Sequence, residues 1–113
     1  MLTNSDLTVY HKIADGHEYR WVGYYYEKIW WFGGKGSSTN KGYDNANDVQ
    51  IRIFYELNPK LDYNKFGIGD ILVQGKYEDI ESENDLRDVL YYNITSLNNN
   101  NFGNNKHIHI GGK

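Results

Sequence analysis

Residues 48–55, with the sequence DVQIRIFY, carry the clearest strand pattern in this chain of 113 residues. Apolar side chains occupy the odd positions from Val49 to Tyr55, and Gln50 and Arg52 alternate with them. Successive side chains of a strand point to opposite faces of a sheet, so this alternation indicates one buried face and one polar face. The stretch therefore favours a β-sheet protein.

Further short strand patterns lie on both sides of this stretch, separated by turn signals such as Asp15-Gly16. They are residues 7–12, residues 19–28 with 29–32 as a direct continuation or after a bulge, a turn and short buried strand in 68–75, residues 91–97 and residues 107–110. Ser82 and Asp85 fit the ends of a capping box, which predicts a short helix.

Many short strands and one short helix predict an all-β fold, a small β-barrel or sandwich with long loops. The length suits a single domain over residues 1–113 with a modest core. The predicted core residues are apolar side chains of these patterns: Val9, Ile51, Ile53, Ile71, Val73, Leu86, Leu90 and Ile94.

Composition narrows the function classes. The net charge of −3 lacks the basic excess that nucleic-acid binding requires, so we expect no specific DNA binding. The absence of cysteine removes thiolate catalysis, disulfides and cysteine-based zinc sites. The start of the chain lacks the features of a signal peptide, and no apolar run approaches the ~20 residues of a membrane helix. We therefore expect no membrane contact and an intracellular chain, or one exported only within a larger assembly.

Three patterns resemble ligand sites but fall short of them. In GGKGSS, residues 33–38, Lys35 precedes glycine where a phosphate-binding loop needs Ser or Thr. His107 and His109 share one face of a strand, as metal ligands do, but no third ligand lies near them in sequence. Residues 44–48 are acidic and amide-rich without the calcium-loop spacing. We predict no metal and no cofactor.

The sequence offers no catalytic pattern either. The serines lie in loop, cap or strand settings, and none follows the nucleophile-elbow spacing. The carboxylates are scattered along the chain. We therefore predict that the protein is not an enzyme.

Two long polar loops and the C-terminal strand favour contacts with other chains. Loops as long as residues 33–47 are uncommon in small domains and usually have a function. Residues 98–106 approach this length. The strand at 107–110 ends almost at the terminus, and its pairing partner belongs either to this domain or to another subunit. We expect both loops and this strand to be completed by protein partners.

The aromatic runs YYY at 24–26 and WWF at 30–32 suggest a second contact surface. Because strand residues alternate faces, about half of these rings belong to the core and the others are exposed or lie between subunits. Large exposed apolar patches usually mark interaction sites. Protein contact is the favoured interpretation, and stacking on a carbohydrate is the alternative.

Several segments spread over nearly the whole chain together resemble a family of small proteins encoded by tailed phages and prophages of Firmicutes. These segments are Leu2-Thr3-Asn4, Tyr10-His11-Lys12, Trp30, Gly33 with Lys35-Gly36, Lys41-Gly42, residues 48–53, residues 68–71, residues 93–96 and residues 107–113. In size and strand order the chain also resembles the head-completion (stopper, or connector) proteins of long-tailed phages.

The resemblance implies a structural virion protein at the neck, between head and tail, that assembles in the host cytoplasm. It implies a cyclic homo-oligomer with six-fold or twelve-fold symmetry, neighboured by portal or adaptor and tail-terminator-type proteins, with genomic DNA passing through its lumen unbound. A phage minor capsid or tail-completion protein and a carbohydrate-binding β-sandwich module are the alternatives. The predicted interface residues come from the loops, the aromatic runs and the last strand: Tyr24, Tyr26, Trp30, Trp31, Lys35, Ser37, Thr39, Lys41, Tyr43, Phe102, His107, His109 and Ile110.

Overall fold

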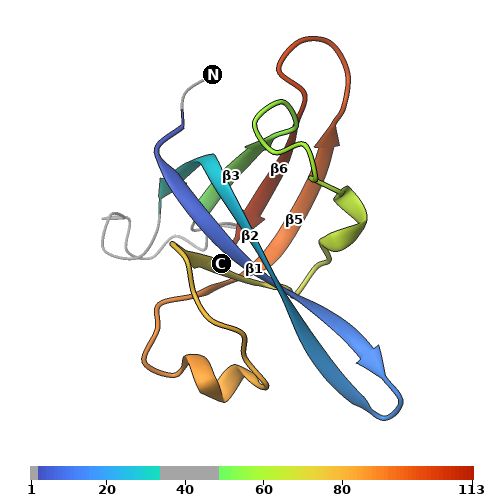
Figure 1. Cartoon of the computed structure of the whole chain (residues 1–113), viewed down its shortest axis with the longest axis vertical. Helices are drawn as coiled ribbons and strands as arrows, with labels where there is room; N and C mark the ends of the chain where they lie inside the picture. Colours follow the sequence, from blue (N-terminus) through green and yellow to red (C-terminus); the bar gives the residue numbers. More distant parts are fainter. Residues whose placement is uncertain (1–2, 34–48) are drawn as a thin grey trace, which may run out of the picture.

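The computed structural model describes residues 3–33 and 49–113, and in them the chain forms an all-β fold (Figure 1). The strands are β1 (Ser5–Asp15), β2 (Glu18–Gly33), β3 (Val49–Phe54), β4 (Ile71–Gln74), β5 (Tyr92–Asn100) and β6 (His107–Gly112). They close into an antiparallel barrel in the order β1-β2-β3-β6-β5-β4, with β4 paired back to β1. This confirms the predicted fold class.

Two short 3-10 helices, η1 (Tyr63–Lys65) and η2 (Glu83–Leu86), lie in the connections around β4. The Asp85 carboxylate accepts hydrogen bonds from the backbone N–H groups of Glu81 and Ser82, as the capping pattern predicts. However, η2 ends at Leu86, so the expected helical face is not continued. Leu86 is fully buried, whereas Leu90 is 54% exposed, and its assignment to the core was wrong.

The alternation in β3 and β6 places isoleucines inside the barrel. Ile51, Ile53, Ile108 and Ile110 are fully buried, and the register sets Ile51 opposite Ile110 and Ile53 opposite Ile108. The other predicted core residues, Leu90 apart, are also buried: Val9, Ile71, Val73, Leu86 and Ile94. One-sided burial of this kind follows directly from the two-residue period of a strand.

Strand β1 departs from the alternation because both of its faces are covered. Residues 7–10 are all buried. Leu7 and Val9 join the barrel core, whereas Tyr10 belongs to a second cluster with Ile71, Leu86 and others. The chain between β4 and β5 crosses the outside of β1, and the Tyr10 hydroxyl donates a hydrogen bond to the carbonyl oxygen of Glu78 there.

Strand β2 is one continuous strand of 16 residues with a bulge in the middle. Ser5 of β1 pairs with Ile29 and Leu7 pairs with Tyr26, so β2 has one more residue than β1 between these pairs. Lys28, inside this interval, has φ of 54°, a left-handed conformation that is uncommon for a residue with a side chain. The extra residue changes which side chains of β2, and therefore which of its rings, face the core.

Strands β1 and β2 extend past the part of β1 that pairs with β4, and there they form a two-stranded hairpin that projects from the barrel (Figure 1). The ladder extends to Asp15 opposite Glu18, and the turn uses Gly16 at φ of 69°. The hairpin therefore carries the first half of β2 away from the barrel.

Candidate functional site

The outer face of β2, β3 and β6 collects polar and aromatic side chains from three distant parts of the sequence. The register places Trp30 opposite Arg52, and Arg52 opposite His109. These side chains point outward because the residues next to them, such as Ile51 and Ile110, point inward. Trp30, Arg52 and His109 therefore form a row across the sheet.

Trp30, Phe32 and Arg52 form the most apolar part of this surface, which we call the aromatic face. The ring centroids of Trp30 and Phe32 are 5.8 Å apart, and their planes differ by only 4°. The Arg52 guanidinium lies over the Trp30 ring, 4.9 Å from its centroid, as in a cation–π contact. Phe32 is 64% exposed. A large exposed ring beside Trp and Arg is typical of a binding surface.

The two histidines of β6 border the aromatic face, and both are engaged by neighbouring groups. The His109 Nε2 atom lies 2.6 Å from Gln50 Oε1, so the imidazole N–H donates to the amide oxygen. Burial, and then the nearby Arg52 and His107, lower the pKa of His109 below its ordinary value. His107 bonds to the Asn105 carbonyl oxygen and the Asn100 side chain.

In the described part of the chain, no group of three His, Cys, Asp or Glu side chains could hold a metal ion. None of the helices found in residues 3–33 and 49–113 is long and apolar enough to cross a membrane.

A second surface lies between the β1–β2 hairpin and residues 81–84, at the other end of β2. Its hollow of about 460 Å³ is lined by aromatic, acidic and polar residues, and we call it the acidic groove: Lys12, Glu18, Tyr19, Trp21, Glu81, Ser82, Glu83 and Asn84. The Lys12 ammonium lies 3.9 Å from the centre of the Tyr19 ring. Three glutamates against one lysine leave the groove with a net negative charge.

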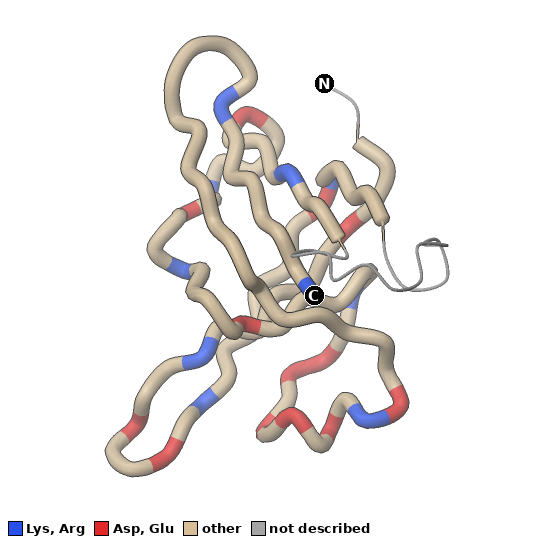
Figure 2. Tube along the Cα trace, turned by 180° about the vertical axis from the view of Figure 1, so that it is seen from behind, with Lys and Arg blue, Asp and Glu red and all other residues tan. Residues whose placement is uncertain are grey.

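The charges of the described residues are unevenly distributed (Figure 2). Acidic residues gather in the connection between β4 and β5, which contains Glu78, Asp79, Glu81, Glu83, Asp85 and Asp88, whereas the hairpin carries both acidic and basic residues. By contrast, residues 29–33 and the strands β3, β5 and β6 contain no Asp or Glu. The aromatic face and the acidic groove therefore differ in electrostatic character.

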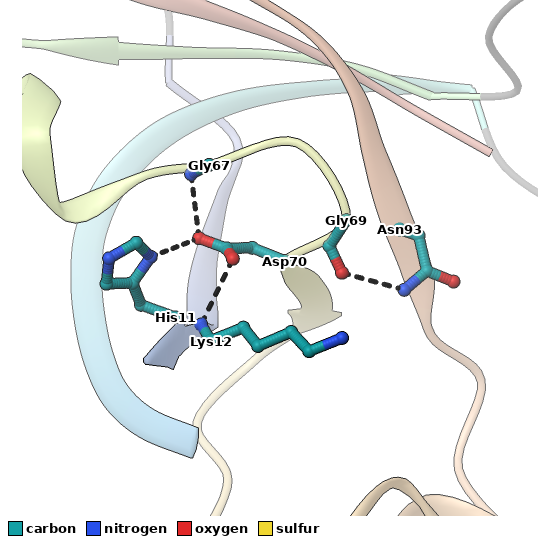
Figure 3. Close-up of polar contacts among 6 residues, drawn as sticks. All are labelled: His11, Lys12, Gly67, Gly69, Asp70 and Asn93. Carbon is teal, nitrogen blue, oxygen red and sulfur yellow. Dashed lines mark hydrogen bonds and ion pairs between the residues drawn. The ribbon is translucent and has the colours of Figure 1, made fainter. Parts of the chain in front are cut away.

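A buried polar cluster joins β1 to the turn before β4 (Figure 3). Asp70 is only 2% exposed. Its Oδ2 atom lies 2.6 Å from His11 Nδ1 and accepts a hydrogen bond from the backbone N–H of Gly67, while Oδ1 accepts one from the N–H of Lys12. Both carboxylate oxygens are thus used to hold the fold, which indicates a structural role.

Several predicted interface residues belong to the core. Tyr26 stacks on Phe66 at 5.5 Å, and Trp31 meets Tyr92 edge-on at 5.9 Å. Both rings are buried, and Ile110 is fully buried between β3 and β5. The assignment of Tyr26, Trp31 and Ile110 to an interface was therefore wrong, because the bulge and the barrel closure turn these side chains inward.

The remaining predicted residues are distributed over the surface. Tyr24 is half-buried, with the Lys65 ammonium 4.9 Å from its ring centre. Phe102 is 76% exposed in the β5–β6 loop, and this loop is shorter than expected because residues 98–100 belong to β5. Of the predicted residues that the structure describes, only Trp30, His107 and His109 lie on one face. The predicted loop residues Lys35, Ser37, Thr39, Lys41 and Tyr43, and most of the loop 33–47, lie outside the described residues.

The expectation that β6 adds to the sheet of a neighbour was wrong. Strand β6 pairs with β3 on one side and β5 on the other. Both of its edges are filled by strands of the same chain, so its backbone groups have no free row for another strand.

The family comparison covers almost the whole chain. A model described as a family of unknown function, DUF6751, matches residues 2–113. The chain belongs to the DUF6751 family. Neither the curated proteins nor the solved structures contain a match to it. The DUF6751 assignment thus identifies relatives without attaching a function.

The predicted interface residues omitted Arg52 and all of the acidic groove, and they omitted Phe32 although it belongs to the aromatic run 30–32. The alternation of β3 predicted that Arg52 points outward, but no local sequence pattern indicated that Trp30 would lie beside it. The groove joins residues 18–21 to residues 81–84. Contacts between segments so far apart leave no local pattern in a sequence.

Proposed function

We propose that this protein is a non-enzymatic structural subunit that acts by binding protein, in a cyclic homo-oligomer at the head–tail junction of a tailed phage. The sequence resemblance to head-completion proteins supports the location. The aromatic face of Trp30, Phe32 and Arg52 is the structural observation that carries the binding role. Trp and Arg dominate the energetics of protein interfaces, and an exposed Phe is stabilised when a partner covers it.

The charge of the chain is compatible with this role. A connector ring surrounds the genome during packaging and ejection, and a strongly basic lumen would hold DNA through its phosphates. The net charge of −3 avoids such retention. A ring subunit also needs two different contact surfaces, because a head-to-tail interface joins unlike patches. The aromatic face and the acidic groove supply two such surfaces.

The test is the composition of purified particles of a phage that encodes this protein. Quantitative mass spectrometry should find the chain at a fixed copy number matching a ring, and electron microscopy should place it at the neck. Absence from purified particles, or a copy number typical of a major capsid protein, would contradict the proposal. A minor capsid or tail-completion role would appear as a fixed copy number at a different location.

A carbohydrate-binding role is the second candidate. The nearly parallel rings of Trp30 and Phe32 beside the amide of Gln50 are an arrangement on which a sugar can stack and form hydrogen bonds. A glycan array probed with the purified protein separates the two functions. Binding to one glycan class that is lost in Trp30→Ala, by a protein that stays monomeric, would favour this candidate over the connector.

A further inference from the structure

The aromatic face carries the cation of Arg52, and the described strand segments that form this face contain no carboxylate. Arg52 projects from β3 over Trp30, and residues 29–33 of β2 and the strands β3, β5 and β6 contain no Asp or Glu. No ion pair is formed by Arg52 among the described residues, whose salt bridges are His11–Asp70 and Arg87–Asp88. The guanidinium keeps hydrogen-bonding capacity for a carboxylate from outside, since it has five N–H donors.

The acidic groove offers the complementary chemistry. Glu18, Glu81 and Glu83 line it together with Tyr19 and Trp21. The rings already hold one cation, because the Lys12 ammonium lies over Tyr19. An aromatic wall with surplus carboxylates suits a guanidinium flanked by rings, which is what the aromatic face presents.

One chain cannot bring these two surfaces together. Both lie on β2, with Trp21 in the groove and Trp30 on the face, nine positions apart in a continuous strand. At roughly 3.3 Å per residue the separation is about 30 Å. The hairpin pairing of β1 and β2 holds this strand extended. Contact between face and groove must therefore join two molecules.

We propose that the aromatic face of one copy docks into the acidic groove of a second copy, with Arg52 placed among Glu18, Glu81 and Glu83. The inference rests on the proposed function and identifies the two surfaces of its homo-oligomer. Such a head-to-tail interface uses each surface once per subunit, and it produces a closed ring when the rotation between neighbours closes. Trp30 and Phe32 supply the buried apolar area, and the charges set the orientation.

Charge exchange between the two surfaces tests the contact. Arg52→Glu replaces the positive charge of the aromatic face with a negative one. Glu81→Arg with Glu83→Arg replaces two negative charges of the acidic groove with positive ones. The full chain is studied by analytical ultracentrifugation over a concentration series, with circular dichroism to verify folding. Because like charges in an interface cost several kcal/mol, each variant alone should need a roughly hundredfold higher concentration to assemble than the wild type. An equimolar mixture of the two variants should assemble again, since the carboxylate introduced in one variant then faces the guanidinium groups introduced in the other.

Matched controls reverse charges elsewhere on the surface. Lys60→Glu and Glu56→Arg alter exposed residues outside both surfaces and should leave assembly unchanged. Raising the salt concentration to about 1 M should weaken wild-type assembly, since the Debye length falls to about 3 Å.

The outcomes separate this contact from the proposed function. If the wild type assembles but the variants assemble equally well, or if mixing them restores nothing, the contact is wrong and the homo-oligomer stands. If the wild type stays monomeric at every concentration, the homo-oligomer itself is refuted, and the contact with it.

Discussion

The Nδ1 atom of His11 lies 2.6 Å from the Oδ2 atom of Asp70, so a side chain of β1 is joined to the turn that precedes β4. Asp70 also accepts backbone hydrogen bonds from Lys12 and Gly67. This one buried carboxylate therefore joins β1 and the turn before β4 at the place where β4 closes the barrel against β1.

Replacing Asp70 with alanine should destabilise the fold. The change leaves the N–H groups of Lys12 and Gly67 without their acceptor and removes a charge-assisted bond to His11, a loss of about 3 kcal/mol. Urea unfolding followed by tryptophan fluorescence measures the change in free energy. Asp88→Ala is the matched control, because that carboxylate is almost fully exposed and its loss should change stability by less than about 0.5 kcal/mol. Equal effects at the two positions would refute the structural role of Asp70.

Gly112 should not tolerate a side chain. A Cβ there would lie 2.9 Å from both Leu72 Cδ1 and Val49 Cγ2, inside the barrel core. Overpacking of this kind costs about 1–3 kcal/mol, so Gly112→Ala should lower the thermal midpoint. Gly67→Ala is the comparison, since a Cβ there meets its nearest neighbours at 3.6 Å, an ordinary contact. A Gly112→Ala variant as stable as Gly67→Ala would contradict the described packing.

His109 should make the fold less stable in mild acid. Burial lowers its pKa in the folded state below the ordinary value of 6.5, so between 6.5 and the lowered value the unfolded chain binds more protons than the folded one. The free energy of unfolding should therefore fall as pH decreases through this window and be unaffected by His109 well above it. His109→Gln removes this contribution. Unfolding in urea at several pH values should show a weaker acid dependence in the variant, and identical slopes would exclude the effect.

The Tyr10 hydroxyl should anchor the acidic connection between β4 and β5. Burial, followed by nearby carboxylates and Tyr77, raises the pKa of Tyr10 to about 12, and the hydroxyl donates to the Glu78 carbonyl oxygen. Tyr10→Phe should cost about 1 kcal/mol and speed amide hydrogen exchange in residues 76–88. The more exposed Tyr77→Phe serves as control. Unchanged exchange in Tyr10→Phe would mean that other contacts hold this segment.

Neighbouring rings of β2 should respond to mutation in opposite ways. Trp31 is in the core, so Trp31→Ala should cost about 4 kcal/mol. Phe32 is largely exposed, so Phe32→Ala should change stability by less than about 0.5 kcal/mol while weakening self-assembly. Thermal denaturation and ultracentrifugation measure the two effects separately. A destabilised Phe32→Ala, or one that assembles normally, would remove Phe32 from the binding surface.

The strands were largely readable from the sequence, and the orientation of the rings was not. In β3 and β6 the two-residue period showed that the isoleucines are buried, and Phe54 is the one apolar side chain of β3 buried outside this period. In β2, rings occur at consecutive positions, so either set suits the core, and the bulge at Lys28 decides between them. A shift of one residue exchanges the two faces of a strand. This is why Trp31 was assigned to the surface.

The sequence by itself determined the all-β class, the alternating strands and most of the core, because these depend on the local order of apolar and polar residues. Only the tertiary structure decided that β6 lies between β3 and β5, that both faces of residues 7–10 are covered, and that Trp30 meets Arg52. These features depend on pairings between distant segments. These pairings are stabilised by closure of the whole barrel, so no short stretch of the sequence predicts them.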